Sequence, residues 1–362
     1  MFDLELTARQ RSWLVPADAL ADGLRTLAAA AERDRKPSIE LLDMIAAGRF
    51  PVPTTDAGRV DPLAVVLAAS WYAQADPGAA LAIVGSWHVP ILLDGAGHLG
   101  ADPGRLDSSA LIYEGFGRQP SECTTTAAWS ADGWIIDGRK ESVLQPGAAG
   151  RYVVLARDTA THRVEAFLLD GDAPGLSVER DDATDGKLGL RAAHTGSVRL
   201  AGVTVPDAAR LVNPADELAV HRAVALCRST LAGVALGCAR ASLAYAMGWA
   251  QTRHAFGKLI AGYQGVSFVL ADLETAIASA ELLLWDTVTR LADTDGAAEL
   301  ERRVARAVAR ATAAATEAGR QGVNVLGVHG IVTEHPVERW YRASASLAAI
   351  DFDPLAHALD VA

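Results

Sequence analysis

The chain has 362 residues, half of them hydrophobic, and a formal net charge of −11. That size allows more than one hydrophobic core, and the negative charge argues against nucleic acid or an acidic membrane as partner. The N-terminal MFDLELTARQ lacks the apolar segment of a signal peptide, and no uninterrupted apolar run of about 18 residues predicts a membrane span. Cys123, Cys227 and Cys238 lack metal-ligand spacing, which favours a reducing cytoplasm.

Residues 1–107 are predicted to form a helical domain. Ala-rich stretches at 18–32 and 62–74 contain few helix breakers. A helix within 41–53 is expected to stop at Gly48. A further helix within 76–97 is expected to end before Pro90, because the residue before a proline avoids the helical conformation. His88 on this helix is interpreted as a packed side chain.

Residues 108–212 are predicted to form a β-domain. Asp137 and Gly138 stand between apolar and polar segments, which is typical of a hairpin turn. RYVVLAR and AFLLD are short β-type runs, and SVRLAGVTVP alternates before Pro206. Prolines and glycines punctuate the segment, so a small barrel or sandwich is expected.

Residues 213–362 are predicted to form a helical bundle. Helices are expected at 216–252, 263–294 and 297–325, and a last one begins near Pro336. Short connections between long helices favour an up-and-down four-helix bundle. The basic run on the third helix is interpreted as a solvated face; it comprises Arg302, Arg303, Arg306 and Arg310. The fold class is therefore α+β and multidomain, in the order helical domain, β-domain, bundle.

A compact corner joins the first two bundle helices. Arg253, Phe256, Gly257 and Lys258 form a basic-aromatic-glycine turn, and Gln264 follows at the start of the next helix. An arginine on such a corner suits a phosphate group, because its planar fork pairs with two oxygens at once.

The order of segments resembles the acyl-CoA dehydrogenase family over nearly the whole chain. The resemblance rests on AAGRFPVP, TAAWSADGWIIDGRKESVLQPGAAGRYVVLAR, VRLAGVTVP, RHAFGKLI with YQGVSFVLADLE, and GVNVLGVHGIVTEHPVERWYR. It implies FAD between the β-domain and the bundle, and an acyl-CoA thioester beside the flavin. It also implies an electron-transfer flavoprotein or similar acceptor, and a homo- or hetero-oligomer built of paired dimers.

The resemblance also assigns residues to the cofactor. Arg253, Phe256 and Gln264 are placed at the diphosphate and adenosine end of a flavin bound in the neighbouring subunit. Asn324 replaces the glutamine of the family's Gln-x-x-Gly-Gly turn, and Gly327 keeps its first glycine. Other positions depart from the family pattern. Val328 replaces the second glycine of the turn, and the segment YEGFGRQPSE keeps Glu114 but little else of the family's motif. Ser142 and Leu144 replace a Trp and a Thr that the family commonly places against the flavin ring.

The family reaction removes an α-proton while the β-hydride goes to flavin. It needs a carboxylate in a dry pocket that raises its pKa. An unbroken count from TEHPVER places this base at Asp351, beside Ile350. Asp351 or Asp353 could instead simply cap the turn before Pro354. Some members carry the base on the first bundle helix, where this chain has Cys227, a poor base unless its pKa is lowered.

Arg228 then matches the family's arginine beside that alternative position, so Arg228 and Ile350 are assigned to the substrate. Three functions remain open. The first is FAD-dependent α,β-dehydrogenation of an acyl-CoA in lipid or steroid side-chain catabolism, in the cytoplasm. The second is a non-catalytic subunit of a heteromeric acyl-CoA dehydrogenase that completes its partner's FAD site. The third is a different flavin reaction, such as oxidation or hydroxylation.

Overall fold

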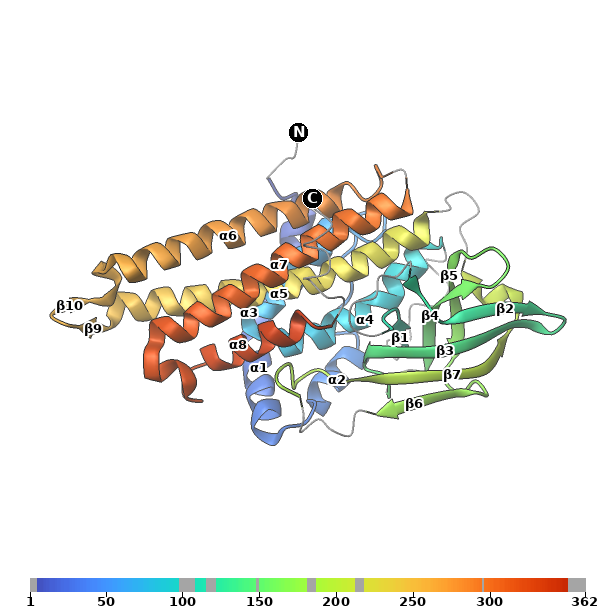
Figure 1. Ribbon diagram of the computed structural model, residues 1–362, viewed down its shortest axis with the longest axis horizontal. Coiled ribbons are helices and arrows are strands. Elements are labelled where there is room, and N and C mark those ends of the chain that lie inside the picture. Colours follow the sequence, from blue (N-terminus) through green and yellow to red (C-terminus); the bar gives the residue numbers. More distant parts are fainter. Residues whose placement is uncertain are drawn as a thin grey trace.

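The computed structural model describes residues 5–97, 108–114, 122–147, 150–180, 187–211, 218–294 and 296–350. The strands of the large sheet gather at one end of an elongated molecule, and the long helices extend away from them to the other end (Figure 1). The first strand begins at Ser108 and the first bundle helix at Ala219. The domain division at 107 and 212 stays a prediction.

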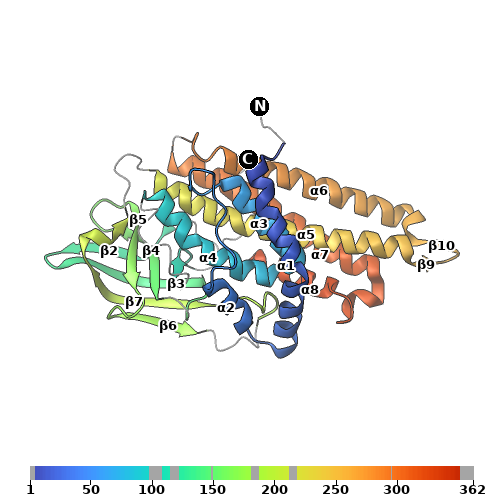
Figure 2. The ribbon, with the colours of Figure 1, turned by 180° about the vertical axis from the view of Figure 1, so that it is seen from behind.

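Four helices form the N-terminal part. They are α1 (Ala8–Asp34), α2 (Ile39–Ala46), α3 (Pro62–Ala75) and α4 (Pro77–Gly95). Helix α1 starts at a capping box of Thr7 and Gln10, and it crosses the helices on the face shown in Figure 2. Gly48 follows α2 in a left-handed conformation with φ of 73°, as expected for a helix stop.

The expected end of the helix before Pro90 is wrong. Helix α4 continues through Pro90 to Gly95, and it buries its side chains on nearly all sides. A proline inside a helix removes one hydrogen bond and bends the backbone. Burial of the surrounding apolar residues outweighs that loss, because most helical stability in proteins comes from tertiary packing.

The β-domain is one sheet of eight strands. The strands are β1 (Ser108–Leu111), β2 (Thr126–Ser130), β3 (Gly133–Leu144), β4 (Arg151–Asp158), β5 (Val164–Asp170), β6 (Leu176–Arg180), β7 (Thr195–Val205) and β8 (Arg210–Leu211). Their order is β6-β7-β3-β2-β4-β5-β8, with β1 also paired to β4. The sheet is mixed, because β1 and β2 run parallel to β4. Its own core includes Tyr152, Phe167 and Val198.

The expected hairpin turn at Asp137 and Gly138 is also wrong. The chain turns at Ala131 and Asp132, between β2 and β3. Asp137 and Gly138 lie inside β3, where its register with β7 shifts. A side chain at Gly138 would collide with Thr125, because an added Cβ would lie 2.5 Å from the Thr125 hydroxyl oxygen. The glycine therefore marks a bulge with a close backbone approach.

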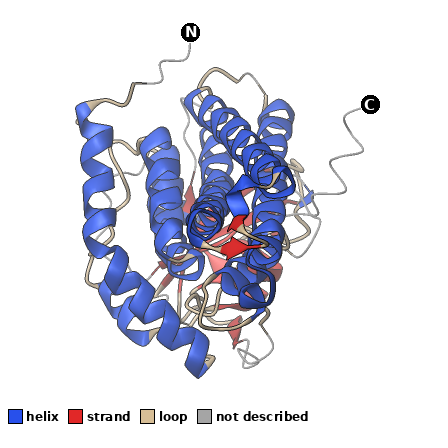
Figure 3. Ribbon diagram, turned by 90° about the vertical axis from the view of Figure 1, so that its left-hand side faces the viewer, coloured by secondary structure: helices blue, strands red, loops and turns tan. Residues whose placement is uncertain are grey.

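The C-terminal bundle consists of α5 (Ala219–Thr252), α6 (Gln264–Thr289), α7 (Ala297–Leu326) and α8 (Val337–Leu347). The bundle is seen from its far end in Figure 3. A two-stranded hairpin, β9 (His254–Ala255) and β10 (Lys258–Leu259), joins α5 to α6. A 3-10 turn, η5 (Gly327–Ile331), joins α7 to the segment before α8. The three long helices agree with their predicted ranges to within a few residues.

Helix α5 packs very closely on α3. An added Cβ at Gly233 would lie 2.8 Å from the Val66 carbonyl oxygen, and one at Gly237 would overlap the Ser70 carbonyl. Only glycine leaves room for this approach. The N-terminal part and the bundle therefore share one continuous hydrophobic core.

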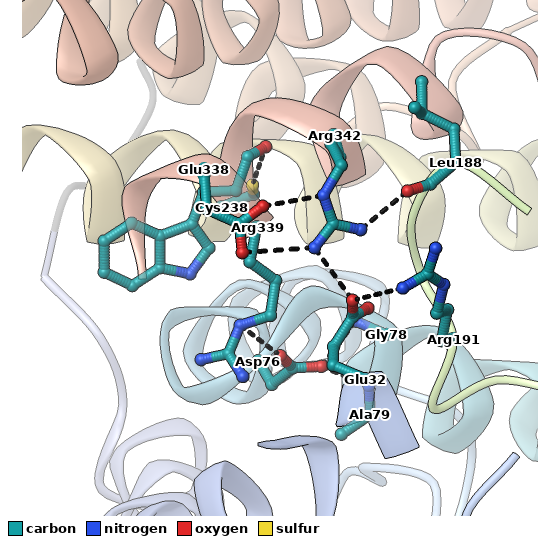
Figure 4. Close-up of polar contacts among 11 residues, drawn as sticks. Glu32, Asp76, Gly78, Ala79, Leu188, Arg191, Cys238, Glu338, Arg339 and Arg342 are labelled. Atoms are coloured by element: carbon teal, nitrogen blue, oxygen red, sulfur yellow. Dashed lines mark hydrogen bonds and ion pairs between the residues drawn. The ribbon is translucent and has the colours of Figure 1, made fainter. Parts of the chain in front are cut away.

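Ion pairs join α1, α8 and the segment before β7 (Figure 4). The Glu32 carboxylate lies 2.8 Å from Arg342 Nη2 and 3.3 Å from Arg191 Nη1. Arg342 also donates to the Leu188 carbonyl over 2.6 Å and pairs with Glu338 at 2.7 Å. All four charged side chains are largely buried, so we call this group the Glu32 cluster.

Two of the described helices are long and apolar enough to cross a membrane. In α4, 83% of the most apolar window is buried inside the protein, and in α5 the share is 67%. Such burial is typical of core helices. The absence of a membrane span stays a prediction.

We expect Gly237→Val to lower the free energy of unfolding by about 2 kcal/mol or more, because overpacking a tight contact forces α3 and α5 apart. Gly248→Ala on the same helix is the matched control, since an added Cβ there meets nothing within 4 Å. The control should stabilise by roughly 0.5–1 kcal/mol. Urea unfolding measures both; equal effects of the two changes would refute the tight contact.

Candidate functional site

The predicted site residues lie at two ends of the molecule. The hairpin that carries Arg253 and Phe256 is at one end, and the β-domain is at the other (Figure 1). Arg228 and Arg253 are both on or next to α5, and their separation of 25 residues corresponds to about 38 Å along a helix. Within one chain, the hairpin is therefore remote from the seam between the β-domain and the bundle.

The hairpin presents two side chains to solvent. The Arg253 guanidinium lies 5.9 Å from the Trp249 ring centre. Phe256 is 97% exposed and has a left-handed φ of 50°. The Tyr263 hydroxyl contacts the carbonyls of Ala255 and Phe256, both at 3.0 Å, and so fixes the loop. An exposed phenylalanine in a conformation that costs about 1–2 kcal/mol points to a contact with another molecule.

The turn after α7 packs on the last part of α5, from which the hairpin starts. The His329 ring in η5 packs 5.1 Å from the Trp249 ring, which joins the turn to the last part of α5. Gly327 has a φ of 61°, and an added Cβ would meet nothing within 4 Å. Asn324 is exposed and donates to the Gln321 side chain over 3.3 Å.

The structure thus brings Arg253, Asn324 and Gly327 to the same end of the bundle, with Phe256 on the adjoining hairpin and exposed Gln264 at the start of α6. The sequence reading missed Trp249, on which Arg253 rests. Its position four residues before Arg253 on a helix was the available signal, because residues at that spacing are neighbours.

At the other end, β3 finishes against the helices. Ser142 and Gln145 both have left-handed backbones, with φ of 52° and 56°. Between them, Leu144 packs into the helical core, whereas Val143 belongs to the core of the β-domain. The Leu144 Cβ would lie only 2.9 Å from a Cβ added at Gly85 of α4. Leu144 therefore already contacts a helix at this seam.

Glu114 is held in a closed network. Its carboxylate accepts from Lys140 Nζ at 2.7 Å, the Thr125 amide at 2.8 Å and the Thr124 hydroxyl at 2.7 Å. The side chains of Glu114 and Lys140 are 4% and 0% exposed. Burial raises the pKa of Glu114, but the Lys140 charge and these hydrogen bonds outweigh it and hold the pKa well below its usual range. Glu114 is therefore an anchor rather than a base.

Cys227 is enclosed between α5 and α4. It is fully buried, and desolvation raises the pKa of its thiol well above the ordinary value. The Sγ atom faces the His88 carbonyl at 3.7 Å. The Thr230 hydroxyl donates its one proton to the Cys227 carbonyl at 2.7 Å, so His88 Nε2, 3.0 Å away, must donate to Thr230.

Burial lowers the pKa of His88 to about 4, which keeps the ring neutral near pH 7. The interpretation of His88 as a packed side chain thus agrees with its contacts. A thiol with a raised pKa in a closed contact cannot take a proton from a substrate. The alternative base position on α5 is therefore inactive in this chain.

The remaining predicted residues lie elsewhere. Arg228 is 1% exposed and lines a small cavity between α5 and α7, together with His221 and Glu301. It thus faces a different side of α5 from Cys227. Ile350, the last described residue, is buried. Asp351 lies outside the described residues.

Comparisons with known proteins identify the family. The model of the acyl-CoA dehydrogenase middle domain matches residues 114–203, and that of the acyl-CoA dehydrogenase C-terminal domain matches residues 218–351. Rat mitochondrial short-chain specific acyl-CoA dehydrogenase is 32% identical over 242 residues, which span 66% of this chain and 57% of the rat protein. The chain belongs to the acyl-CoA dehydrogenase family.

Solved structures share the fold over nearly their full length. Butyryl-CoA dehydrogenase from Megasphaera elsdenii superposes with a TM-score of 0.81 at 22% identity and covers 99% of this chain and 98% of its own. Glutaryl-CoA dehydrogenase from Mycobacterium smegmatis, in complex with FADH2, gives 0.81 at 20% identity over 98% and 94%. The expected fold class is confirmed, and so is FAD as the cofactor of the family.

The hairpin residues fit the adenosine diphosphate half of FAD. Arg253 is exposed and pairs with no carboxylate among the described residues, so its fork is available for a diphosphate. Phe256 offers an exposed aromatic face, and a Cβ added at Gly327 would meet nothing within 4 Å. The flavin-ring half of FAD has less room. Leu144, at a position where the resemblance places a residue against the ring, packs on α4 at Gly85.

Removing the Lys140 charge from the Glu114 network should destabilise the folded protein. We expect Lys140→Met to lower the free energy of unfolding by about 3–5 kcal/mol, because it leaves a buried carboxylate without its counter-ion. Adding Glu114→Gln should restore much of that loss, since the amide oxygen still accepts from the Thr125 amide. Urea unfolding of the single and double variants at pH 7 tests this; a double variant no more stable than Lys140→Met would contradict it.

Proposed function

We propose that this chain is part of a FAD-dependent acyl-CoA dehydrogenase that introduces an α,β double bond into an acyl-CoA thioester. The observation that carries the proposal is the hairpin. It holds an exposed arginine without an acidic partner among the described residues, beside an exposed phenylalanine. Family membership supplies the reaction class.

Each predicted residue then has a role set by its chemistry. Arg253 pairs with the diphosphate, Phe256 and Gln264 contact the adenosine, and Asn324 and Gly327 provide the adjoining turn. When bound, FAD supplies the hydride acceptor for the β-carbon of the thioester. Asp351 takes the α-proton, which requires a desolvated carboxylate with a raised pKa. The enclosure of Cys227 leaves Asp351 as the one predicted base position that carries a carboxylate.

The substrate side of the proposal is an acyl-CoA of lipid or steroid side-chain catabolism, with Arg228 and Ile350 near the acyl group. An electron-transfer flavoprotein or a similar carrier accepts the electrons. The reaction is placed in the cytoplasm.

A second candidate function is that of a non-catalytic subunit in a heteromeric acyl-CoA dehydrogenase. The contact between Leu144 and α4 favours it, because the seam is already closed at a position expected to face the flavin ring. In that role, the hairpin would complete a flavin site in the partner subunit. The two functions differ in whether the chain purified alone carries flavin.

The absorbance spectrum of the purified chain tests the cofactor. We expect a yellow protein, and Arg253→Ala should retain at least about tenfold less FAD after gel filtration, because charge-assisted bidentate hydrogen bonds are lost. Arg290→Ala is the control, since Arg290 pairs with Asp286 on α6, away from the hairpin. A colourless parent would favour the non-catalytic subunit. Unchanged FAD occupancy in Arg253→Ala would show that Arg253 does not bind the diphosphate.

Asp351→Asn tests the base. The substitution keeps the size of the side chain but removes the basic oxygen. Acyl-CoA should then bleach the flavin at least about 100-fold more slowly under anaerobic conditions, the lower range for a positioned base, while FAD stays bound. Asp353→Asn and Cys227→Ala should have far smaller effects. If all three variants bleach like the parent, another residue or a partner chain takes the proton.

A further inference from the structure

A cluster of aromatic and histidine side chains lies at the end of the bundle that carries the hairpin. Its centre is Trp249, in the last turn of α5. The ring centres of His329 and His335 lie 5.1 and 5.2 Å from that of Trp249. The two histidine rings are 5.5 Å apart and nearly perpendicular, at 80°. The three rings are therefore all in mutual contact, and we call them the Trp249 cluster.

The same indole also carries a permanent cation. The Arg253 guanidinium lies 5.9 Å from the Trp249 ring centre. Each imidazole centre is therefore within about 11 Å of the guanidinium, which is close to the Debye length of roughly 10 Å at 0.1 M salt. A positive charge on either ring thus acts on an anion that binds Arg253.

The surroundings of the two histidines are compatible with a positive charge. Among the described residues, no carboxylate lies within ion-pairing distance of either ring. The Tyr245 hydroxyl lies 2.8 Å from His335 Nδ1, and a hydroxyl can accept from a protonated ring as well as donate to a neutral one. Trp340 of α8, which packs on Tyr245, carries no charge. Glu334, next to His335 in the sequence, is exposed. Both rings can therefore take up a proton without losing a hydrogen bond.

The other charged groups near Arg253 are more open to solvent. His254 and Lys258 are exposed on the hairpin, whereas His329 and His335 are partly buried. Lys258 Nζ also donates to the Gly262 carbonyl over 2.8 Å. Salt screens exposed charges more strongly than partly buried ones. The histidine pair is therefore expected to contribute more than His254 to any change of charge at this site with pH.

We propose that His329 and His335 supply proton-dependent positive charge to the Arg253 site, so that its affinity for the adenosine diphosphate half of a dinucleotide rises as the pH falls. Histidine is the side chain whose charge ordinarily changes between pH 5 and 8. Protonation adds positive charge beside Arg253, and a bound anion favours the protonated rings in turn, because coupling between two binding events is reciprocal. The identity of the ligand rests on the proposed function.

The charges of the ligand and the cluster balance one another. Two protonated rings 5.5 Å apart repel each other and also repel Arg253. A dinucleotide diphosphate carries two negative charges, which offset this repulsion. Binding of the diphosphate should therefore be accompanied by uptake of protons from solution in the pH range where histidine titrates.

Binding of FAD to the flavin-free chain near pH 8 and near pH 6 tests the proposal. The diphosphate of FAD is a diester, so its charge does not change over this range. At low salt, the affinity should be roughly threefold higher near pH 6, because the added charges act over roughly 10 Å on a doubly charged group. Calorimetry in two buffers with different ionisation enthalpies should show net proton uptake on binding.

The double variant His329→Gln, His335→Asn should lose most of the pH dependence and of the proton uptake. A merely structural role of the pair would weaken binding without removing proton uptake. His162→Asn is the remote control, since His162 is exposed between β4 and β5 and has a left-handed φ of 60°, which asparagine tolerates. His254→Asn is the control on the hairpin, and it should keep more than half of the pH effect.

His329→Arg provides a second test that does not depend on the double variant. It fixes a positive charge at this position at every pH. The affinity for FAD near pH 8 should therefore rise, and the difference between pH 8 and pH 6 should shrink. A His329→Arg chain that binds FAD like the parent at both pH values would count against the proposal.

The outcomes separate this proposal from the proposed function. A parent that binds FAD equally at both pH values would overturn the role of the histidines and leave the FAD site intact, and so would equal pH dependence in the parent and the double variant. If the chain binds no FAD, ADP-ribose, which carries the same adenosine diphosphate diester, replaces it. Binding of ADP-ribose with a pH dependence that the double variant loses would reject the flavin reaction alone. Binding of neither compound would reject both proposals.

Discussion

The helical parts of this molecule depend on the packing around helix α5. Gly233 and Gly237 let α3 approach so closely that any larger residue would strike its carbonyl groups. The N-terminal half of α5 carries Cys227 and Arg228, and its end carries Arg253. Helices α4, α6, α7 and α8 also pack against α5. The length of α5 therefore sets the distance between the hairpin and the seam between the β-domain and the bundle.

The sequence predicted the helices well wherever a long periodic pattern had room to repeat. The three long bundle helices were predicted to within a few residues, because the spacing of their apolar residues reflects the face that each helix buries. The errors at Pro90 and at Asp137–Gly138 have a common cause. Both are local signals that usually mark an end or a turn, and both are overridden by contacts with distant parts of the chain.

The candidate site was predictable at the hairpin and much less so at the seam. Arg253, Phe256 and their glycine stand next to one another in the sequence, so their local geometry could be inferred together. The contact of Leu144 with Gly85 and that of Cys227 with His88 join residues that are distant in the sequence. Such contacts depend on how whole domains pack. Asp351 stays a prediction.

The Glu32 cluster has a consequence for the order in which the protein can be completed. Glu32 and Arg342 are 310 residues apart in the sequence, so the ribosome releases them far apart in time. At roughly 5–20 residues per second, synthesis of that interval takes about 15–60 s. Throughout that time, Glu32 on α1 cannot form its ion pair with Arg342, because α8 has not yet been synthesised. A chain interrupted shortly before α8 would retain its first helices but lack the ion pairs that fasten them to the C-terminal bundle.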